Sequence, residues 1–214
     1  MKITVECPNW EYSTVPGANE DLSARAKSAL SQLVSLDPPD QERIAKDTRP
    51  IHREYFRGLT PPGFDYYAGH YRGENFPCLV DYEVHVQGDV RVGHTAATVL
   101  LEMDQLASDI DDVFKKLALA WSANEKLFGK ELKVYRTIEL ATAVFVYFLE
   151  IHPYANGNGH MGRLVLITIL ARFGIFLRRW PLHPRPPDPP YTELIAMYRS
   201  GNRAPLERFV LSCI

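Results

Sequence analysis

Residues 151–163 read Ile-His-Pro-Tyr-Ala-Asn-Gly-Asn-Gly-His-Met-Gly-Arg, a polar run between two long apolar segments. The segments before and after it, 137–150 and 161–176, both have helical character. The run therefore predicts a loop that joins two buried helices and ends at the N-terminus of the second.

The same loop has the composition of an anion site. A helix N-terminus leaves main-chain N–H groups unpaired and carries a partial positive charge, so it can hold an anion. Gly157 and Gly159 would let the main chain approach such a ligand and adopt positive φ. His152 stands at the edge, where an imidazole can accept a proton near neutral pH. The loop predicts a phosphate cradle with a base beside it.

The bulk composition is that of an ordinary globular protein. The chain has 214 residues, of which 46% are hydrophobic and 23% are charged, so one domain with a full core is expected. The formal net charge of −2 argues against a broad nucleic-acid footprint. The N-terminus lacks the apolar region of a signal peptide, and no charge-free apolar stretch reaches ~18 residues. We expect no membrane partner, and a cytoplasmic protein or one delivered into a host cell by a secretion system.

The cysteines give little sign of a structural role. Cys7, Cys78 and Cys213 are far apart, odd in number and without metal-ligand spacing. This pattern favours unpaired cysteines in a reducing compartment over a disulfide framework.

The rest of the chain reads as mainly α-helical with one small hairpin. Helices are expected over 22–35, 41–56 with a break near Pro50, 95–119 with a further break, 131–150, 161–176, 191–200 and 204–213. Ile3 and Val5 indicate a short strand. Val84, Val86, Val90 and Val92 alternate around Gln87-Gly88-Asp89, which predicts a β-hairpin.

The loop also matches a known pattern. His-Pro-Tyr-Ala-Asn-Gly-Asn-Gly-His-Met-Gly-Arg resembles the signature of the Fic/Doc family, His-x-Phe-x-(Asp/Glu)-Gly-Asn-Gly-Arg-x-x-Arg. The positions that agree are His152, Gly157, Asn158, Gly159 and Arg163. Tyr154 is a conservative aromatic replacement, whereas Asn156 and His160 depart from the pattern.

The resemblance extends beyond the loop. Gly69-His70-Tyr71-Arg72 is similar to a Gly-x-Tyr-Arg segment that often precedes the family's flap, and the predicted hairpin lies where that flap is placed. The resemblance implies a Fic-type helical bundle over residues 55–214, with the valines of the hairpin in a flap that aligns the target. Residues 1–54 are expected to form an N-terminal helical extension.

Family members mostly transfer AMP from ATP to a protein hydroxyl, which implies ATP and Mg²⁺ or Mn²⁺ here, and a Ser, Thr or Tyr of a target protein. His152 would be the general base. Asn158 and the main-chain N–H groups of 157–160, Gly159 included, would form the anion hole. Arg163 would hold the terminal phosphates. Pro153 would stiffen the loop and Tyr154 would anchor it.

The two departures leave the reaction open. Asn156 stands where the family has its magnesium carboxylate, so it would be a weak, uncharged ligand. His160 replaces an arginine with an imidazole that is mostly neutral at pH 7. The alternatives are therefore a transferase that uses another donor, moving phosphate, UMP or phosphocholine, or an inactive binding module with a Fic fold.

The sequence offers no self-inhibitory motif and no metal-binding histidines outside the loop. The family's self-inhibitory pattern, (Ser/Thr)-x-x-x-Glu-(Gly/Asn), is not found in the sequence, so any restraint is expected from an antitoxin or another regulatory partner, as in a toxin or effector. His85, His94 and His183 lack metal-ligand spacing and are expected to be structural or surface residues.

Overall fold

The computed structural model describes residues 6–86, 89–126 and 128–214. Over these residues the chain is mainly α-helical, as predicted. The helices are α1 (Ala18–Ser35), α2 (Pro38–Lys46), α3 (Arg49–Tyr55), α4 (Ala96–Ser122), α5 (Lys130–Ile151), α6 (Asn158–Arg172), α7 (Tyr191–Arg199) and α8 (Ala204–Ser212), with short 3₁₀ turns η1 (Tyr12–Thr14) and η2 (Asp65–Tyr67).

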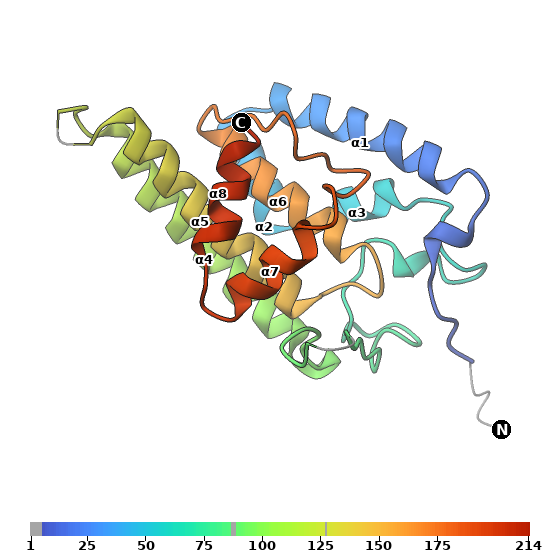
Figure 1. Cartoon of the computed structure of the whole chain (residues 1–214). Coiled ribbons are helices and arrows are strands. Elements are labelled where there is room, and N and C mark those ends of the chain that lie inside the picture. Colours follow the sequence, from blue (N-terminus) through green and yellow to red (C-terminus); the bar gives the residue numbers. More distant parts are fainter. Residues whose placement is uncertain (1–5, 87–88, 127) are drawn as a thin grey trace.

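The centre of the fold is a bundle around α6. This helix packs against α5 and α2, while α4 packs against both of those helices (Figure 1). The buried residues of α4 recur at helical spacing and form one apolar stripe: Ala96, Val99, Met103, Leu106, Ile110, Val113, Phe114 and Leu117. By contrast α6 is buried on nearly every side, which is why its sequence shows little amphipathic period.

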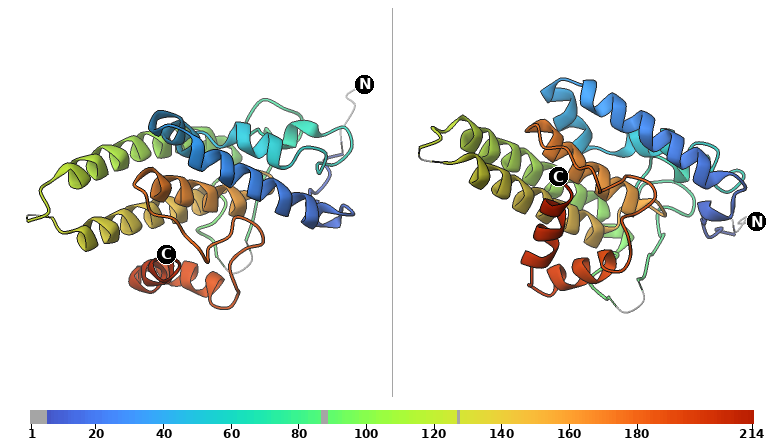
Figure 2. Two further views of the ribbon diagram at one scale, coloured as in Figure 1. Left: turned by 90° about the horizontal axis from the view of Figure 1, so that it is seen from above. Right: turned by 45° about the horizontal axis from the view of Figure 1, so that its top comes forward.

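Two pairs of shorter helices flank this bundle. α1 packs against α3 on one side, and α7 packs against α8 on the other, where α8 also contacts α5 (Figure 2). Because α2 belongs to the bundle through α6, part of the N-terminal 54 residues contributes directly to the core. The division of the chain at residue 54 remains a prediction. None of the described helices is long and apolar enough to cross a membrane.

The expected helices are present with changes at their ends. The helix predicted over 41–56 with a break near Pro50 is two helices, and the break falls at Asp47 and Thr48, just before Pro50 in the first turn of α3. Asp37 caps α2 by accepting a 3.0 Å hydrogen bond from the Asp40 N–H, so Pro38 begins a helix here. The break expected within 95–119 is absent, since α4 is continuous. The strand expected at Ile3 and Val5 lies outside the described residues.

The β-hairpin prediction was wrong for the described part of the flap. Residues 84–86 and 89–92 form no strand, and the intended turn, Gln87-Gly88, lies outside the described residues. The main-chain N–H of Gly93 instead donates to the Glu150 carbonyl oxygen at 2.9 Å, and that of His94 donates to Ile151 at 3.3 Å. Hydrogen bonds to the end of α5 therefore replace those that a strand ladder would need. Period-two alternation therefore predicted neither the main-chain partners of this segment nor the burial of its valines, of which only Val92 is buried.

The expectation of unpaired cysteines was also wrong. Cys7 and Cys78 form a disulfide with their Cα atoms 5.5 Å apart, and the buried Cys213 is free. The bond joins residues 71 positions apart in the sequence, so local spacing could not indicate it. The sequence favoured a reducing compartment because the cysteines were expected to be unpaired, and this disulfide removes that argument.

Candidate active site

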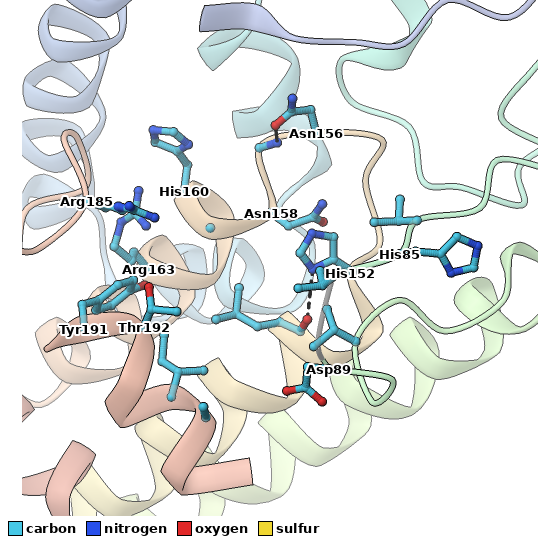
Figure 3. Close-up of a pocket in the computed structure, with 18 of the residues that line it drawn as sticks. His85, Asp89, His152, Asn156, Asn158, His160, Arg163, Arg185, Tyr191 and Thr192 are labelled. Carbon is cyan, nitrogen blue, oxygen red and sulfur yellow. Dashed lines mark hydrogen bonds between the residues drawn. The ribbon is translucent and has the colours of Figure 1, made fainter. Parts of the chain in front are cut away.

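The predicted loop opens on a cavity of about 850 Å³. Its walls come from four parts of the chain: the N-terminal residues 11–12, the flap residues 84–86 and 89–92, the loop and helix ends of 149–163, and residues 183–199. Figure 3 shows His152 near the middle of this cavity, with Arg163, Arg185 and Tyr191 together on one side. The fold thus brings the sequence-predicted loop residues into one site.

His152 is held as a neutral imidazole. Its Nδ1 lies 3.0 Å from the Leu149 carbonyl oxygen. Because a carbonyl oxygen only accepts, this contact assigns the ring proton to Nδ1 and leaves the lone pair on Nε2. Burial lowers the pKa of His152 to about 4, and the positive charges of Arg72 and Arg199 act in the same direction. The ring is therefore uncharged at neutral pH and able to accept a proton.

The main chain at His152 is in the left-handed region, with φ of 55°. A non-glycine residue seldom adopts this conformation unless its surroundings hold it there. The buried Arg72 provides that support, because its guanidinium donates to the carbonyl oxygens of His152 at 2.8 Å and Ile151 at 3.1 Å. The same group donates to the carbonyl oxygens of Tyr82 and His94, which lie on either side of the flap, at 2.9 and 2.8 Å. One side chain thus joins the end of α5 to the flap.

Asn158 closes the loop on itself. Its Oδ1 accepts from the Tyr154 N–H at 2.8 Å, and its Nδ2 donates to the Tyr154 carbonyl oxygen at 2.8 Å. The side chain therefore works mainly as a clamp on the loop. The main-chain N–H groups of Asn158 and Gly159, at the start of α6, have no hydrogen-bond partner among the described residues. They remain free to bind an anion.

The two glycines of the loop differ in how closely their neighbours approach. Gly157 has φ of 82°, and a Cβ placed on it would lie 2.4 Å from a ring carbon of Phe56 and 2.9 Å from His52 Nε2. A Cβ on Gly159 would lie 3.2 Å from Nη1 of Arg163. A larger residue at 157 would displace α3, whereas one at 159 would crowd the arginine.

Tyr154 anchors the loop in the core, as the resemblance implied for this position. Its ring is fully buried and stacks on His52 at a centroid distance of 3.7 Å, and its hydroxyl shares a 2.7 Å hydrogen bond with Thr48. His52 accepts from the Gly69 N–H through Nδ1 and so donates from Nε2 to the Asn156 carbonyl oxygen at 3.0 Å. The loop thus rests on α3 through a neutral histidine.

Arg163 lies one turn into α6 and is buried. Its Nε and Nη2 donate to the Leu182 carbonyl oxygen at 3.1 and 2.8 Å. Nη1 is directed toward Gly159, beside the free N–H groups. The guanidinium is therefore fixed in the wall of the cavity with one nitrogen left for a ligand.

The two residues that depart from the signature, Asn156 and His160, form hydrogen bonds with segments outside the loop. Asn156 accepts from the Gly157 N–H through Oδ1 and donates from Nδ2 to the Trp10 carbonyl oxygen, both at 2.6 Å. His160 Nε2 shares a 3.0 Å hydrogen bond with His183 Nδ1. Burial, followed by the charge of Arg163, lowers the pKa of His160 to about 2, so the ring is neutral.

A model of the Fic/DOC family matches residues 44–170. The chain belongs to the Fic/DOC family. A protein adenylyltransferase Fic of Nematostella vectensis is 26% identical over 127 residues, which are 58% of this chain and 28% of that relative. The chain thus matches less than a third of the relative's length. No solved structure matches the chain significantly. These findings support a Fic-type transferase at the level of the family.

The flap of this Fic/DOC chain is a loop rather than a hairpin. Its valines differ in placement: Val92 is buried, Val84 and Val86 line the cavity, and Val90 is fully exposed. Asp89 pairs with Arg199 of α7 at 3.2 Å and with Arg91 at 2.8 Å. The flap is therefore held to α7 across the mouth of the cavity by a carboxylate that both arginines share.

Several residues that build this Fic/DOC site were missed by the sequence interpretation. Arg72 was noticed only as part of a Gly-x-Tyr-Arg run, without its role, and His52 carries no local signal. Glu11 and Arg185 line the cavity from segments outside the loop. His183, expected to be structural or on the surface, bonds to His160 at the cavity wall. None of these contacts follows from sequence spacing, because each partner is distant along the chain.

Proposed function

We propose that this Fic/DOC chain transfers AMP from ATP to a Ser, Thr or Tyr hydroxyl of a target protein. The observation that carries the proposal is that the free N–H groups of Asn158 and Gly159 lie in the wall of the cavity that holds His152 and Arg163. An anion cradle, a neutral base and a fixed guanidinium are the groups that nucleotidyl transfer requires. The adenylyltransferase relative supports AMP as the group transferred.

In the proposed reaction the target hydroxyl oxygen attacks the α-phosphorus of ATP. His152 takes the hydroxyl proton on Nε2, since Nδ1 already carries a proton bonded to Leu149. The bond between the α-phosphorus and the oxygen that bridges to the β-phosphate breaks, and pyrophosphate leaves with the electron pair. The N–H groups of Asn158 and Gly159 stabilise the charge on the α-phosphoryl oxygens.

The leaving group would be held on the other wall. Arg163 offers Nη1, and the buried hydroxyl of Tyr191 lies beside Arg163 in the lining of the same cavity. Both groups can donate to phosphate oxygens. His160 is neutral and bonded to His183, so it would add no charge to this grip.

A divalent cation fits these residues in part. Oδ1 of Asn156 keeps one lone pair beyond its bond to Gly157, but it brings no negative charge. No cluster of three or more His, Cys, Asp or Glu that could hold a metal occurs among the described residues, and Mg²⁺ is commonly held by one carboxylate and the donor's own phosphates. When bound, Mg²⁺ or Mn²⁺ would neutralise phosphate charge.

A donor panel tests the proposal. Purified protein is incubated with a lysate or an acceptor protein and with ATP, UTP or a phosphocholine donor, and products are read by intact mass, because each transferred group adds a different mass. We expect an AMP adduct that is lost in His152→Ala and kept in the matched variant His70→Ala, whose histidine pairs with Glu74 outside the cavity. Absence of any adduct from folded protein would overturn transferase activity.

A different donor is the second candidate. It is favoured by one observation, that Asn156 and His160 have both become hydrogen-bond partners of other segments. An adduct of UMP, phosphate or phosphocholine in the same panel would replace AMP transfer with this candidate. A non-catalytic binding module predicts instead that His152→Ala leaves the protein's cellular effect unchanged.

A further inference from the structure

The two residues that depart from the signature each bind a segment outside the loop. Nδ2 of Asn156 donates to the carbonyl oxygen of Trp10 at 2.6 Å, in the N-terminal segment. His160 shares its 3.0 Å hydrogen bond with His183, in the proline-rich connection between α6 and α7. The N–H donor of Asn156 has no counterpart in the carboxylate of the signature. The imidazole of His160 has one nitrogen that can accept a hydrogen bond, which the guanidinium of an arginine lacks.

A charged residue follows each contact closely in the sequence. Glu11 comes directly after Trp10, and Arg185 comes two residues after His183; both line the cavity. Glu11 is negative and follows the residue that Asn156 binds, whereas Arg185 is positive and follows the residue that His160 binds. These are the charges that the signature has at positions 156 and 160 and that this loop does not have. Figure 3 shows Arg185 on the same side of the cavity as Arg163.

The N-terminal segment is held firmly enough to position Glu11. The disulfide between Cys7 and Cys78 lies before it, and the buried Trp10 ring donates from Nε1 to the Leu59 carbonyl oxygen at 2.7 Å. After it, the Tyr12 ring packs edge-on against His160 at a centroid distance of 5.7 Å. The Glu11 main chain is thus fixed on both sides.

No contact within the protein accounts for the position of the Glu11 carboxylate at the cavity. It is exposed at the cavity and makes no hydrogen bond or ion pair with a described residue. The lining of the same cavity includes the cations Arg163, Arg185 and Arg199, a set suited to a polyanion. A free carboxylate would repel that polyanion, unless a cation lies between them.

The connection that bears Arg185 is fixed in a similar way. The Leu182 carbonyl oxygen accepts two hydrogen bonds from Arg163, and His183 bonds to His160. Arg185 itself is largely exposed and pairs with Asp188 at 3.2 Å. An exposed pair of this kind contributes little, so the guanidinium can turn to a phosphate at small cost.

We propose that Glu11 and Arg185 replace, from outside the loop, the carboxylate and the guanidinium that the loop lacks. Glu11 binds the divalent cation of a nucleoside polyphosphate, and Arg185 binds the phosphates. The inference rests on the proposed function, since it takes a metal–nucleotide complex as the donor. It assigns Asn156 and His160 to positioning these two segments.

Substitutions of Glu11 and Arg185 should differ in how their effect on ATP binding depends on the metal. Wild-type protein and variants are titrated with ATP in Mn²⁺ and, separately, in EDTA, with calorimetry for the nucleotide and the electron paramagnetic resonance signal of free Mn²⁺ for the metal. We expect Glu11→Gln to weaken binding in Mn²⁺ by about tenfold or more, and to leave binding in EDTA equal or tighter because a repelling charge is gone. Glu20→Gln, an exposed glutamate outside the cavity, is the matched control.

Arg185→Gln should weaken ATP binding both in Mn²⁺ and in EDTA, because the guanidinium contacts phosphate directly. Arg57→Gln is its control, since Arg57 is exposed and lies outside the cavity. Restoring the signature residue should compensate: Asn156→Asp for Glu11→Gln, and His160→Arg for Arg185→Gln. Circular dichroism of each variant separates a binding defect from a folding defect.

The outcomes distinguish the inference from the proposed function. If wild-type protein binds Mn²⁺–ATP and Glu11→Gln binds it equally well, the inference is wrong while the proposed function stands. If Glu11→Gln weakens binding equally with and without metal, its role is structural and the inference is also wrong. If wild-type protein binds no ATP under either condition, AMP transfer from ATP is overturned and the inference with it.

Discussion

Nε of Arg72 donates a 2.8 Å hydrogen bond to the carbonyl oxygen of His152, the residue whose main chain is left-handed. The candidate base is therefore held by a side chain that is 80 residues away in the sequence. The Arg72 guanidinium also donates to the carbonyl oxygens of Tyr82 and His94, which flank the flap, so the positions of His152 and of the flap depend on one group.

Arg72→Met should destabilise the protein strongly. The variant keeps much of the apolar stem but leaves four carbonyl oxygens without their donor, two of them at the end of α5. We expect a loss of about 3–5 kcal/mol in unfolding free energy and a Tm lower by about 10 °C. Thermal and urea unfolding would measure both. The control is Arg57→Met, at an exposed arginine in the turn after α3, and equal Tm values for the two variants would contradict the role of Arg72.

Gly157→Ala separates steric contact from main-chain strain. Gly174 has φ of 72° with no atom within 4 Å of an added Cβ, so Gly174→Ala should cost only the strain, about 1–2 kcal/mol. At Gly157 the added carbon would also meet Phe56 at 2.4 Å, which adds about 1–3 kcal/mol. Urea denaturation of both variants gives the comparison. A smaller loss for Gly157→Ala than for Gly174→Ala would show that α3 does not pack on the loop as described.

Acid should unfold the protein through three buried histidines. Burial lowers the pKa of His52 to about 3, of His152 to about 4 and of His160 to about 2, from an ordinary value of 6.5. Below pH 6.5 the unfolded chain therefore binds protons that the folded protein does not. Their contribution to stability is fully present above this pH and falls as the pH decreases toward the folded values, by up to about 1.4 kcal/mol per pH unit for each histidine.

Urea denaturation at about pH 7.5 and about pH 5 measures this dependence. His52→Phe keeps a buried ring without the titrating group, so it should flatten the dependence even where it lowers stability at neutral pH. An unfolding free energy that stays constant between the two pH values would contradict the burial of these rings.

Thiol counting tests the disulfide. Denatured protein without reductant should show one reactive thiol, that of Cys213, and reduction should reveal Cys7 and Cys78 as well. Because the bond closes a long loop, its removal should cost about 4 kcal/mol in the loop-entropy account. Cys7→Ser, with Cys213→Ser as control, measures that cost by thermal unfolding. Three reactive thiols in protein denatured without reductant would rule the bond out.

The loop was recognisable from its sequence because its requirements are local. Gly157 needs a positive φ, and Asn158 reaches Tyr154 only four residues away, so the composition of 152–163 already carries this geometry. The helices on either side were equally clear from their apolar content. The flap was not, since its main chain bonds to the end of α5, and alternation of its valines suggested a ladder that the described residues do not form.

Asn156 and His160 show what the sequence by itself could not indicate. Compared with the family signature, Asn156 removes a negative charge and His160 removes a positive charge. In the folded protein their side chains form hydrogen bonds with Trp10 and His183, in two segments whose residues Glu11 and Arg185 line the cavity.

The helical fold and the local geometry of the loop at 152–163 thus follow from the order of residues alone, because capping, turn formation and helical burial act over a few positions. The orientation of His152, the disulfide and the charges around the cavity were decided only by tertiary structure. Arg72 and Cys7 lie far along the chain from the residues they contact, and Glu11 and Arg185 lie far from the loop whose cavity they line. No short-range preference specifies such an arrangement, which arises when the helices pack and bring distant segments to one surface.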